Sequence, residues 1–222
     1  MLNTKKKYSL KGKILTIFGT VLAFFFCQGN RAYAQVGDSP IYRFETSGTA
    51  QLTDHLKFKA AQRWELSSDD AYDYEHLSLT AVYSRFEYLD ISSETRIITK
   101  EEYGISSSET RPNIKLAPKI TLGSFSLKNE FSIELRSRSD RRDVYRHKNK
   151  FIVKHKSGLY LANEFFYDFS EHGLTNDEFD LGIERPLGEN FRVQFGVKRC
   201  FNIKDGWSKK WDMFQLRFKF YL

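Results

Sequence analysis

The residues whose types and spacing could do chemistry are His76 and Ser78, which a single leucine separates. Residues two apart on a β-strand lie on the same face, so this imidazole could reach the hydroxyl and activate it for attack on an acyl ester. No second motif places an amide or carboxylate to orient the histidine. The favoured interpretation is therefore structural, with His76 hydrogen-bonded among charged side chains near Arg96. We expect no catalytic residues and no enzymatic activity.

The other histidines and the cysteine of the exported chain show no ligand spacing. His147, His155 and His172 form no metal-binding pattern with one another or with Cys200. Cys200 lacks a partner for a disulfide once the first 34 residues are removed, and we expect it to be buried or to face the interior. The sequence predicts neither a metal nor an organic cofactor.

The first 34 residues have the pattern of a cleaved signal peptide. A basic stretch ends at Lys13, the 14 residues of Ile14–Cys27 are apolar, and Ala32-Tyr33-Ala34 precedes the expected cleavage site. The apolar run is shorter than the about 20 residues of a membrane-spanning helix. Residues 35–222 are therefore expected to be exported as a single domain.

The positive charge of the chain is concentrated in this leader. The sequence has 35 Lys and Arg against 28 Asp and Glu, but six of the basic residues and none of the acidic ones lie in the first 34. The rest of the chain holds 29 basic and 28 acidic residues. Such a balance does not support a general affinity for polyanions, and no nucleic-acid partner is predicted.

Apolar and polar residues alternate from residue 42 onward, in segments of about eleven residues. This period of two is typical of β-strands, and no window shows a helical period, so the predicted class is all-β. The segments begin at residues 42, 56, 75, 87, 112, 125, 143, 159, 177, 191 and 211.

Short and long connections alternate between these segments. The short ones fall near 53–55, 85–87, 123–124, 156–158 and 188–190, and the long ones at 67–74, 99–111, 138–143, 170–176 and 202–210. This alternation is typical of an up-and-down antiparallel β-barrel with tight turns at one rim and open loops at the other. The loop 99–111 is expected to be long enough to fold inward or to reach a partner.

Hairpin registers that align the apolar faces also bring opposite charges together. They place Lys150 opposite Glu164 and Arg146 opposite Asp168. In the same way they place Asp180 opposite Lys198, Arg43 opposite Glu65 and Glu45 opposite Arg63, whereas Lys119 meets Lys128. Opposite charges across a sheet stabilise it by about 0.2–1 kcal/mol each, which supports the pairing.

Alternation alone fits either a soluble lipocalin-like barrel or a membrane barrel with its apolar face outward. The paired charges suit a crowded lumen, and segments of about eleven residues match the about 9–11 residues of a tilted transmembrane strand. We therefore predict a transmembrane β-barrel of 10–12 strands in the cell outer membrane, with short periplasmic turns and longer outer loops. Bacterial barrels of one chain favour even numbers of strands. Either the segment from residue 42 lies outside the ladder, leaving ten strands, or residues 35–41 add a twelfth.

The candidate lumen residues are charged side chains on the polar faces of these segments: Arg63, Glu130, Glu134, Arg136, Arg146, Lys148, Lys150, Lys154, Glu164, Asp168, Asp180, Glu184 and Lys198. The basic residues between 138 and 154 could form an anion-attracting wall or contact lipopolysaccharide phosphates. Pairing with the carboxylates of neighbouring strands is the favoured alternative. The expected partners are outer-membrane lipids, with lipopolysaccharide as a further candidate, and the barrel-assembly machinery during biogenesis.

The run from Tyr42 to Leu222 resembles the domain of unknown function 2490 family of outer-membrane proteins. The resemblance is carried by Leu52–Leu66, Tyr74–Ser84, Leu159–Phe169 and Phe179–Val197. It implies a barrel in the outer membrane of a Gram-negative cell and no established activity.

Two functions follow from these observations: a small passive pore whose lumenal charges set its selectivity, or a closed structural or surface-binding barrel. A lipid-acting hydrolase is the least favoured. Leu77 and Leu79 occupy the predicted lipid face, so His76 and Ser78 would point into the lumen.

Overall fold

Eleven β-strands and no helix make up the part of the chain that the computed structural model describes, residues 40–67, 72–102, 105–139, 143–204 and 206–222. No helix there is long and apolar enough to cross a membrane. The predicted signal peptide, 1–34, lies outside the described residues. The strands are β1 (Ile41–Thr53), β2 (Leu56–Ser67), β3 (Tyr72–Phe86), β4 (Leu89–Glu102), β5 (Ile105–Leu122), β6 (Phe125–Arg138), β7 (Val144–His155), β8 (Leu159–Asp168), β9 (Gly173–Pro186), β10 (Phe191–Asn202) and β11 (Ser208–Tyr221).

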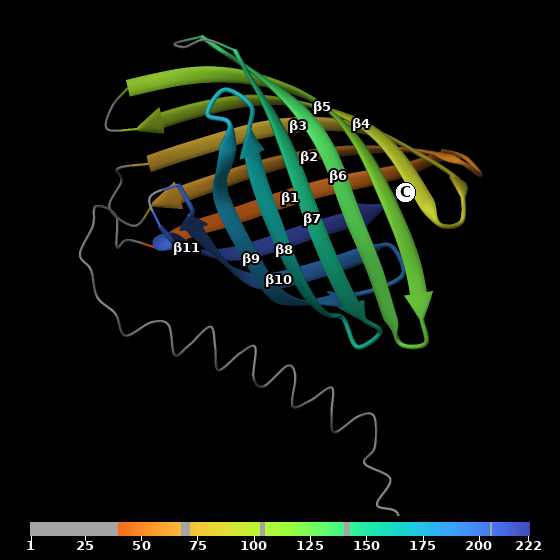
Figure 1. Ribbon diagram of the computed structural model, residues 1–222. Coiled ribbons are helices and arrows are strands. Elements are labelled where there is room, and N and C mark those ends of the chain that lie inside the picture. Colours follow the sequence, from red (N-terminus) through yellow and green to blue (C-terminus); the bar gives the residue numbers. More distant parts are fainter. Residues whose placement is uncertain (1–39, 68–71, 103–104, 140–142, 205) are drawn as a thin grey trace, which may run out of the picture. The chain divides into compact units, whose positions relative to one another are not determined.

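These strands form one closed barrel in which sequential strands are neighbours (Figure 1). All sequential pairs are antiparallel, and β1 closes the barrel by pairing in parallel with β11, from Ile41 opposite Met213 to Thr49 opposite Tyr221. The all-β barrel is thus confirmed, while its antiparallel description needs one correction. An odd number of alternating strands leaves the first and the last pointing the same way. The eleven strands lie within the predicted range of 10–12, although neither the ten-strand nor the twelve-strand alternative holds.

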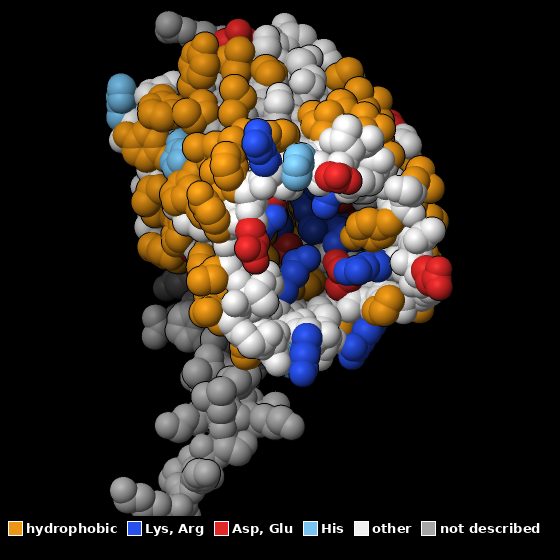
Figure 2. Space-filling view, turned by 90° about the vertical axis from the view of Figure 1, so that its right-hand side faces the viewer, with side chains coloured by type: hydrophobic (Ala, Val, Ile, Leu, Met, Phe, Trp, Pro, Cys, Tyr) orange, Lys and Arg blue, Asp and Glu red, His pale blue; other side chains and the backbone are white. Residues whose placement is uncertain are grey.

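The apolar faces of the strands point outward and the polar faces point inward. Leu79 is 61% exposed and Ile114 is 64% exposed, whereas Glu134 is fully buried and Asp180 is 2% exposed. Figure 2 shows hydrophobic side chains around the outside of the barrel and Lys, Arg, Asp and Glu side chains in the hollow at its centre. This is the reverse of a soluble barrel, which encloses its apolar face.

The predicted hairpin registers are confirmed. Lys150 lies opposite Glu164 and Arg146 opposite Asp168, and the pairs 180/198, 43/65 and 45/63 are also found. Lys119 lies opposite Lys128 as expected, and the lysine pair is compensated from a third strand. Asp90 on β4 lies 2.6 Å from Lys119 and 3.8 Å from Lys128.

The prediction of a loop at 99–111 is wrong over most of that range. β4 continues to Glu102 and β5 begins at Ile105, with Thr99 opposite Ser108 and Glu101 opposite Ser106. The backbone ladder continues here although the side chains are almost all polar. The strand pair therefore extends beyond the apolar band that reveals the other strands in the sequence.

Two rims result from this topology. One carries the short turns, and we call it the short-turn rim; there Gly123 and Gly158 have positive φ values of 62° and 88°, which favour glycine. A Cβ on Gly158 would also collide with the carbonyl oxygen of Glu184. The other rim joins β2 to β3, β4 to β5, β6 to β7, β8 to β9 and β10 to β11, and we call it the long-connection rim.

Candidate functional site: the charged lumen

Two neighbouring cavities occupy the barrel interior. The larger has a volume of about 450 Å³ and the smaller about 250 Å³. The smaller one is lined by Lys100, Ser107, Glu109 and Lys210, which lie near strand ends at the long-connection rim. The residues that line both cavities are Tyr74, Arg111, Arg146, Asn176, Glu178 and Trp211.

Basic residues outnumber acidic ones in the described linings. The larger cavity is lined by eleven basic and six acidic side chains, and the smaller by five and two. The basic side chains of the larger cavity are Arg43, Lys59, Arg63, Arg96, Arg111, Lys115, Arg146, Lys148, Lys150, Lys198 and Arg217. Basic side chains still exceed acidic ones around the larger cavity when the buried carboxylates of Glu134 and Asp180 are added, and this excess favours anions over cations.

Glu134 is the centre of the most deeply buried charge cluster. Lys148 Nζ donates to Glu134 Oε2 at 2.7 Å, and Arg146 Nη2 donates to Oε1 at 2.6 Å. Arg96 lies 3.4 Å away on the other side. One carboxylate on β6 thus serves three cations from β4 and β7.

Glu109 holds a second cluster nearer the long-connection rim. Its carboxylate lies 2.6 Å from both Arg111 and Arg136, and 3.5 Å from Arg138. This carboxylate is again shared by more cations than it can neutralise, so the wall formed by β4 to β7 carries surplus positive charge.

The opposite wall is organised around Asp180. Tyr160 Oη and Gln215 Nε2 donate to Asp180 Oδ1 at 2.9 and 3.1 Å, and Arg217 lies 3.5 Å from Oδ2. A Cβ on Gly196 would collide with the Tyr160 hydroxyl, and one on Gly182 would lie 2.6 Å from it. The tyrosine therefore packs across β9 and β10 because both strands carry glycine there.

Most of the predicted lumen residues line the cavities: Arg63, Glu130, Arg136, Arg146, Lys148, Lys150, Glu164 and Lys198. Glu134 and Asp180 are buried within the charge clusters. Glu184 binds Lys219 near the short-turn rim and lies 3.9 Å from Lys154, whose side chain is half exposed. Asp168 lies opposite Arg146, but its carboxylate accepts from the backbone and hydroxyl of Ser170.

Sequence reasoning placed Arg96 near the inward-facing His76 but missed Arg111 and Arg217 as lumen residues. Arg111 lay in the segment interpreted as a loop, where no apolar alternation marked a strand. Arg217 lies on a strand with clear alternation, and the same inward parity that identified Arg63 would have found it.

The His76 and Ser78 pair points into the lumen, as predicted. Their exposures are 3% and 4%, while the intervening Leu77 is 47% exposed. His76 Nδ1 makes a 3.0 Å hydrogen bond with the Tyr74 hydroxyl, and Ser78 Oγ donates to the Ala61 carbonyl at 3.5 Å. These bonds give both residues structural partners.

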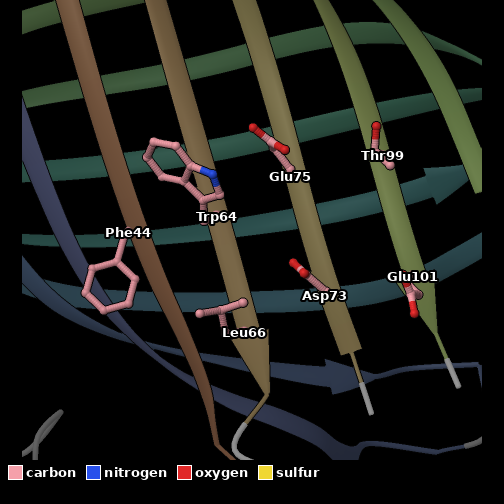
Figure 3. Close-up of a pocket in the computed structure, with 7 residues that line it drawn as sticks. All are labelled: Phe44, Trp64, Leu66, Asp73, Glu75, Thr99 and Glu101. Atoms are coloured by element: carbon pink, nitrogen blue, oxygen red, sulfur yellow. The ribbon is translucent and has the colours of Figure 1, made fainter. Parts of the chain in front are cut away.

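A further pocket of about 490 Å³ lies on the outward face near the long-connection rim (Figure 3). Phe44, Trp64 and Leu66 on β1 and β2 line one side of it, and the acidic residues lie on β3 and β4. Gln62 donates to Glu75 at 2.8 Å. The pocket marks the level at which the outward face changes from apolar to charged. Its other lining residues are Asp73, Glu75, Thr99 and Glu101.

Comparison with known proteins gives likenesses in structure alone. No family model and no curated protein match the sequence. The solved structure of LpxR from Salmonella typhimurium is similar, with a TM-score of 0.49 and 8% identity over 76% of this chain and 83% of that one. LpxR is an outer-membrane β-barrel and a lipid A deacylase. Because this neighbour is an enzyme, the prediction that the chain has no enzymatic activity is corrected, and no residue role is transferred from it.

Proposed function

We propose that this protein is an outer-membrane β-barrel that acts as a small passive pore with a charged lumen. The observation that carries the proposal is the reversed arrangement of side chains, apolar outside and charged around two cavities inside. An apolar surface that surrounds a barrel is poorly suited to water, and lipid covers it without requiring hydrogen bonds. A charged lumen, in turn, holds water and ions.

The strand lengths support a membrane location. They run from 10 residues in β8 to 18 residues in β5, and a tilted crossing needs about 9–11. In this proposal residues 1–34 direct export, the short turns are periplasmic and the long connections face outward. Membership of the domain of unknown function 2490 family, and contacts with lipopolysaccharide and the assembly machinery, belong to the same proposal.

The charges of the lumen specify which solutes the pore would favour. Eleven basic against six acidic side chains around the larger cavity favour small anions over cations. Eleven strands lie between the eight of side-chain-filled barrels and the sixteen or more of wide porins, which restricts passage to small solutes.

Planar-bilayer recording tests the pore. Unboiled, detergent-extracted protein should give discrete current steps that boiled protein does not give. Under a KCl gradient, the reversal potential should have the sign of chloride selectivity. Silence from protein that is shown to be inserted would contradict the pore, and cation selectivity would contradict the role given to the basic lining.

A closed barrel is the second candidate, and the buried Glu134 cluster favours it. The side chains of Glu134 and Lys148 are 0% and 5% exposed, so ion pairs fill part of the cross-section. If the inserted protein is silent, function moves to the rims and the outer face.

A further inference from the structure

The smaller cavity, at the long-connection rim, combines the features of an anion site. Five basic side chains and two carboxylates line it. Both carboxylates already have cationic partners, because Glu109 binds Arg111 and Arg136 and Glu178 binds Lys198. Arg146 in turn shares the carboxylate of Glu134 with Lys148 and Arg96. The arginines of this lining therefore share each carboxylate with other cations.

Two arginines in this lining also have N–H donors without an acceptor. The Nε–H groups of Arg111 and Arg146 are buried and make no hydrogen bond within the described residues. A buried donor without an acceptor is costly, and an anion that accepts from it removes this cost. Both arginines line the two cavities, so they lie where the cavities meet.

The size and the remaining walls define the ligand. A volume of about 250 Å³ is below the range of about 300–1,000 Å³ for drug-sized ligands and suits a small solute. Guanidinium groups bind phosphate oxygens in pairs of parallel hydrogen bonds, which a chloride ion cannot accept. Ser107 and Asn176 add neutral polar groups to the lining.

We propose that the smaller cavity is a binding site for a phosphate group, held by Arg111 and Arg146 at the junction of the two cavities. Six of its lining residues also line the larger cavity inside the barrel, which favours a free solute over a lipid headgroup. The inference names the class of solute for the proposed pore. Transport of phosphate rests on the proposed function, whereas binding of phosphate does not.

Calorimetric titration of the folded protein in detergent with inorganic phosphate, at constant ionic strength set by chloride, tests the site. We expect saturable binding, and an affinity about tenfold or more weaker in Arg111→Gln and in Arg146→Gln. Arg192→Gln, which removes the same charge at the short-turn rim, should bind like the unsubstituted protein. Absence of saturable binding, or equal affinity in all variants, would overturn the proposal.

Folding of each variant is checked by its heat-dependent gel shift. If either arginine variant fails to fold, Lys210→Gln replaces it, with the same expected loss of affinity. This change removes a cation from the same lining but does not break an ion pair of the Glu109 cluster. Phosphate binding together with electrical silence would retain the site and reject the pore. Anion current without phosphate binding would retain the pore and reject the site.

Discussion

At position 134 a single carboxylate holds three cations together inside the barrel. Glu134 accepts from Lys148 and Arg146 and lies close to Arg96, and it is fully shielded from solvent. Its neighbours come from two other strands, so the residue fixes β4, β6 and β7 relative to one another. Removal of one member of such a cluster leaves buried charge uncompensated.

Glu134→Gln should therefore lower the free energy of unfolding by about 3 kcal/mol or more, the usual cost of breaking a buried ion pair from one side. Urea titration of the barrel folded in detergent, followed by tryptophan fluorescence, measures this. Glu75→Gln, on the exposed outward face, removes an equal charge and should change the stability by less than about 0.5 kcal/mol. Equal effects of the two changes would show that the cluster is not structural.

Gly196 is the residue that lets Tyr160 cross the sheet. Gly196→Ala should destabilise the barrel by about 1–3 kcal/mol, because Tyr160 can make room only by giving up its hydrogen bond to Asp180. Gly48→Ala is the matched control, since nothing lies within 4 Å of a Cβ at that position. Thermal loss of the folded gel mobility compares the two. The account of Tyr160 fails if both alanines are tolerated equally.

The sequence predicted which residues lie opposite one another but not which of them bind. Asp180 lies opposite Lys198 in the ladder, yet its ionic partner is Arg217 on β11, and Lys198 binds Glu178. Long side chains in a narrow lumen reach diagonally and across strands. Alternation fixes the face of a residue, whereas its partner depends on the curvature of the closed barrel.

At the scale of elements, the sequence predicted the hairpin registers accurately but not the pairing of β1 with β11 that closes the barrel. Each hairpin has a turn that fixes its register, so the predicted pairings across the turns at 156–158 and 188–190 are found. No turn joins β1 to β11, and the pairing of these strands depends on the circumference of the whole sheet. The extension of β4 and β5 into residues 99–111 was not predicted for a different reason. A polar strand pair lacks the apolar alternation by which strands are recognised in a sequence.

The parallel seam between β1 and β11 can be tested by crosslinking in a background where Cys200 is replaced by serine. Thr46→Cys combined with Phe218→Cys should form a disulfide on oxidation, because the two positions are direct neighbours. Thr46→Cys with Phe214→Cys displaces the partner by four residues, about 13 Å along a strand, and should not. Gel mobility after proteolysis between the two sites reports the bond. Crosslinking of the displaced pair alone would reject the register.

At the scale of the molecule, the apolar outer face predicts that the barrel is surrounded by lipid. Leu79 is among the most exposed apolar residues and lies in the middle of β3. In liposomes, Leu79→Arg should lower the stability by about 2–4 kcal/mol, the cost of a cation near the middle of a bilayer. Ser106→Arg, exposed at the long-connection rim, should be close to neutral. A neutral Leu79→Arg would contradict membrane insertion.

The direction of β1 has a consequence for the two ends of the barrel. Ile41 lies at the long-connection rim and Tyr221 at the short-turn rim, because the first and last strands run in parallel. A barrel with an even number of strands brings both ends back to the same side. If the barrel spans a membrane as proposed, the odd number of strands places its two ends on opposite sides of that membrane. A protease added on one side would then cut either a peptide tag placed before β1 or a tag placed after β11, but not both. The tag that is cut reports the orientation of the barrel.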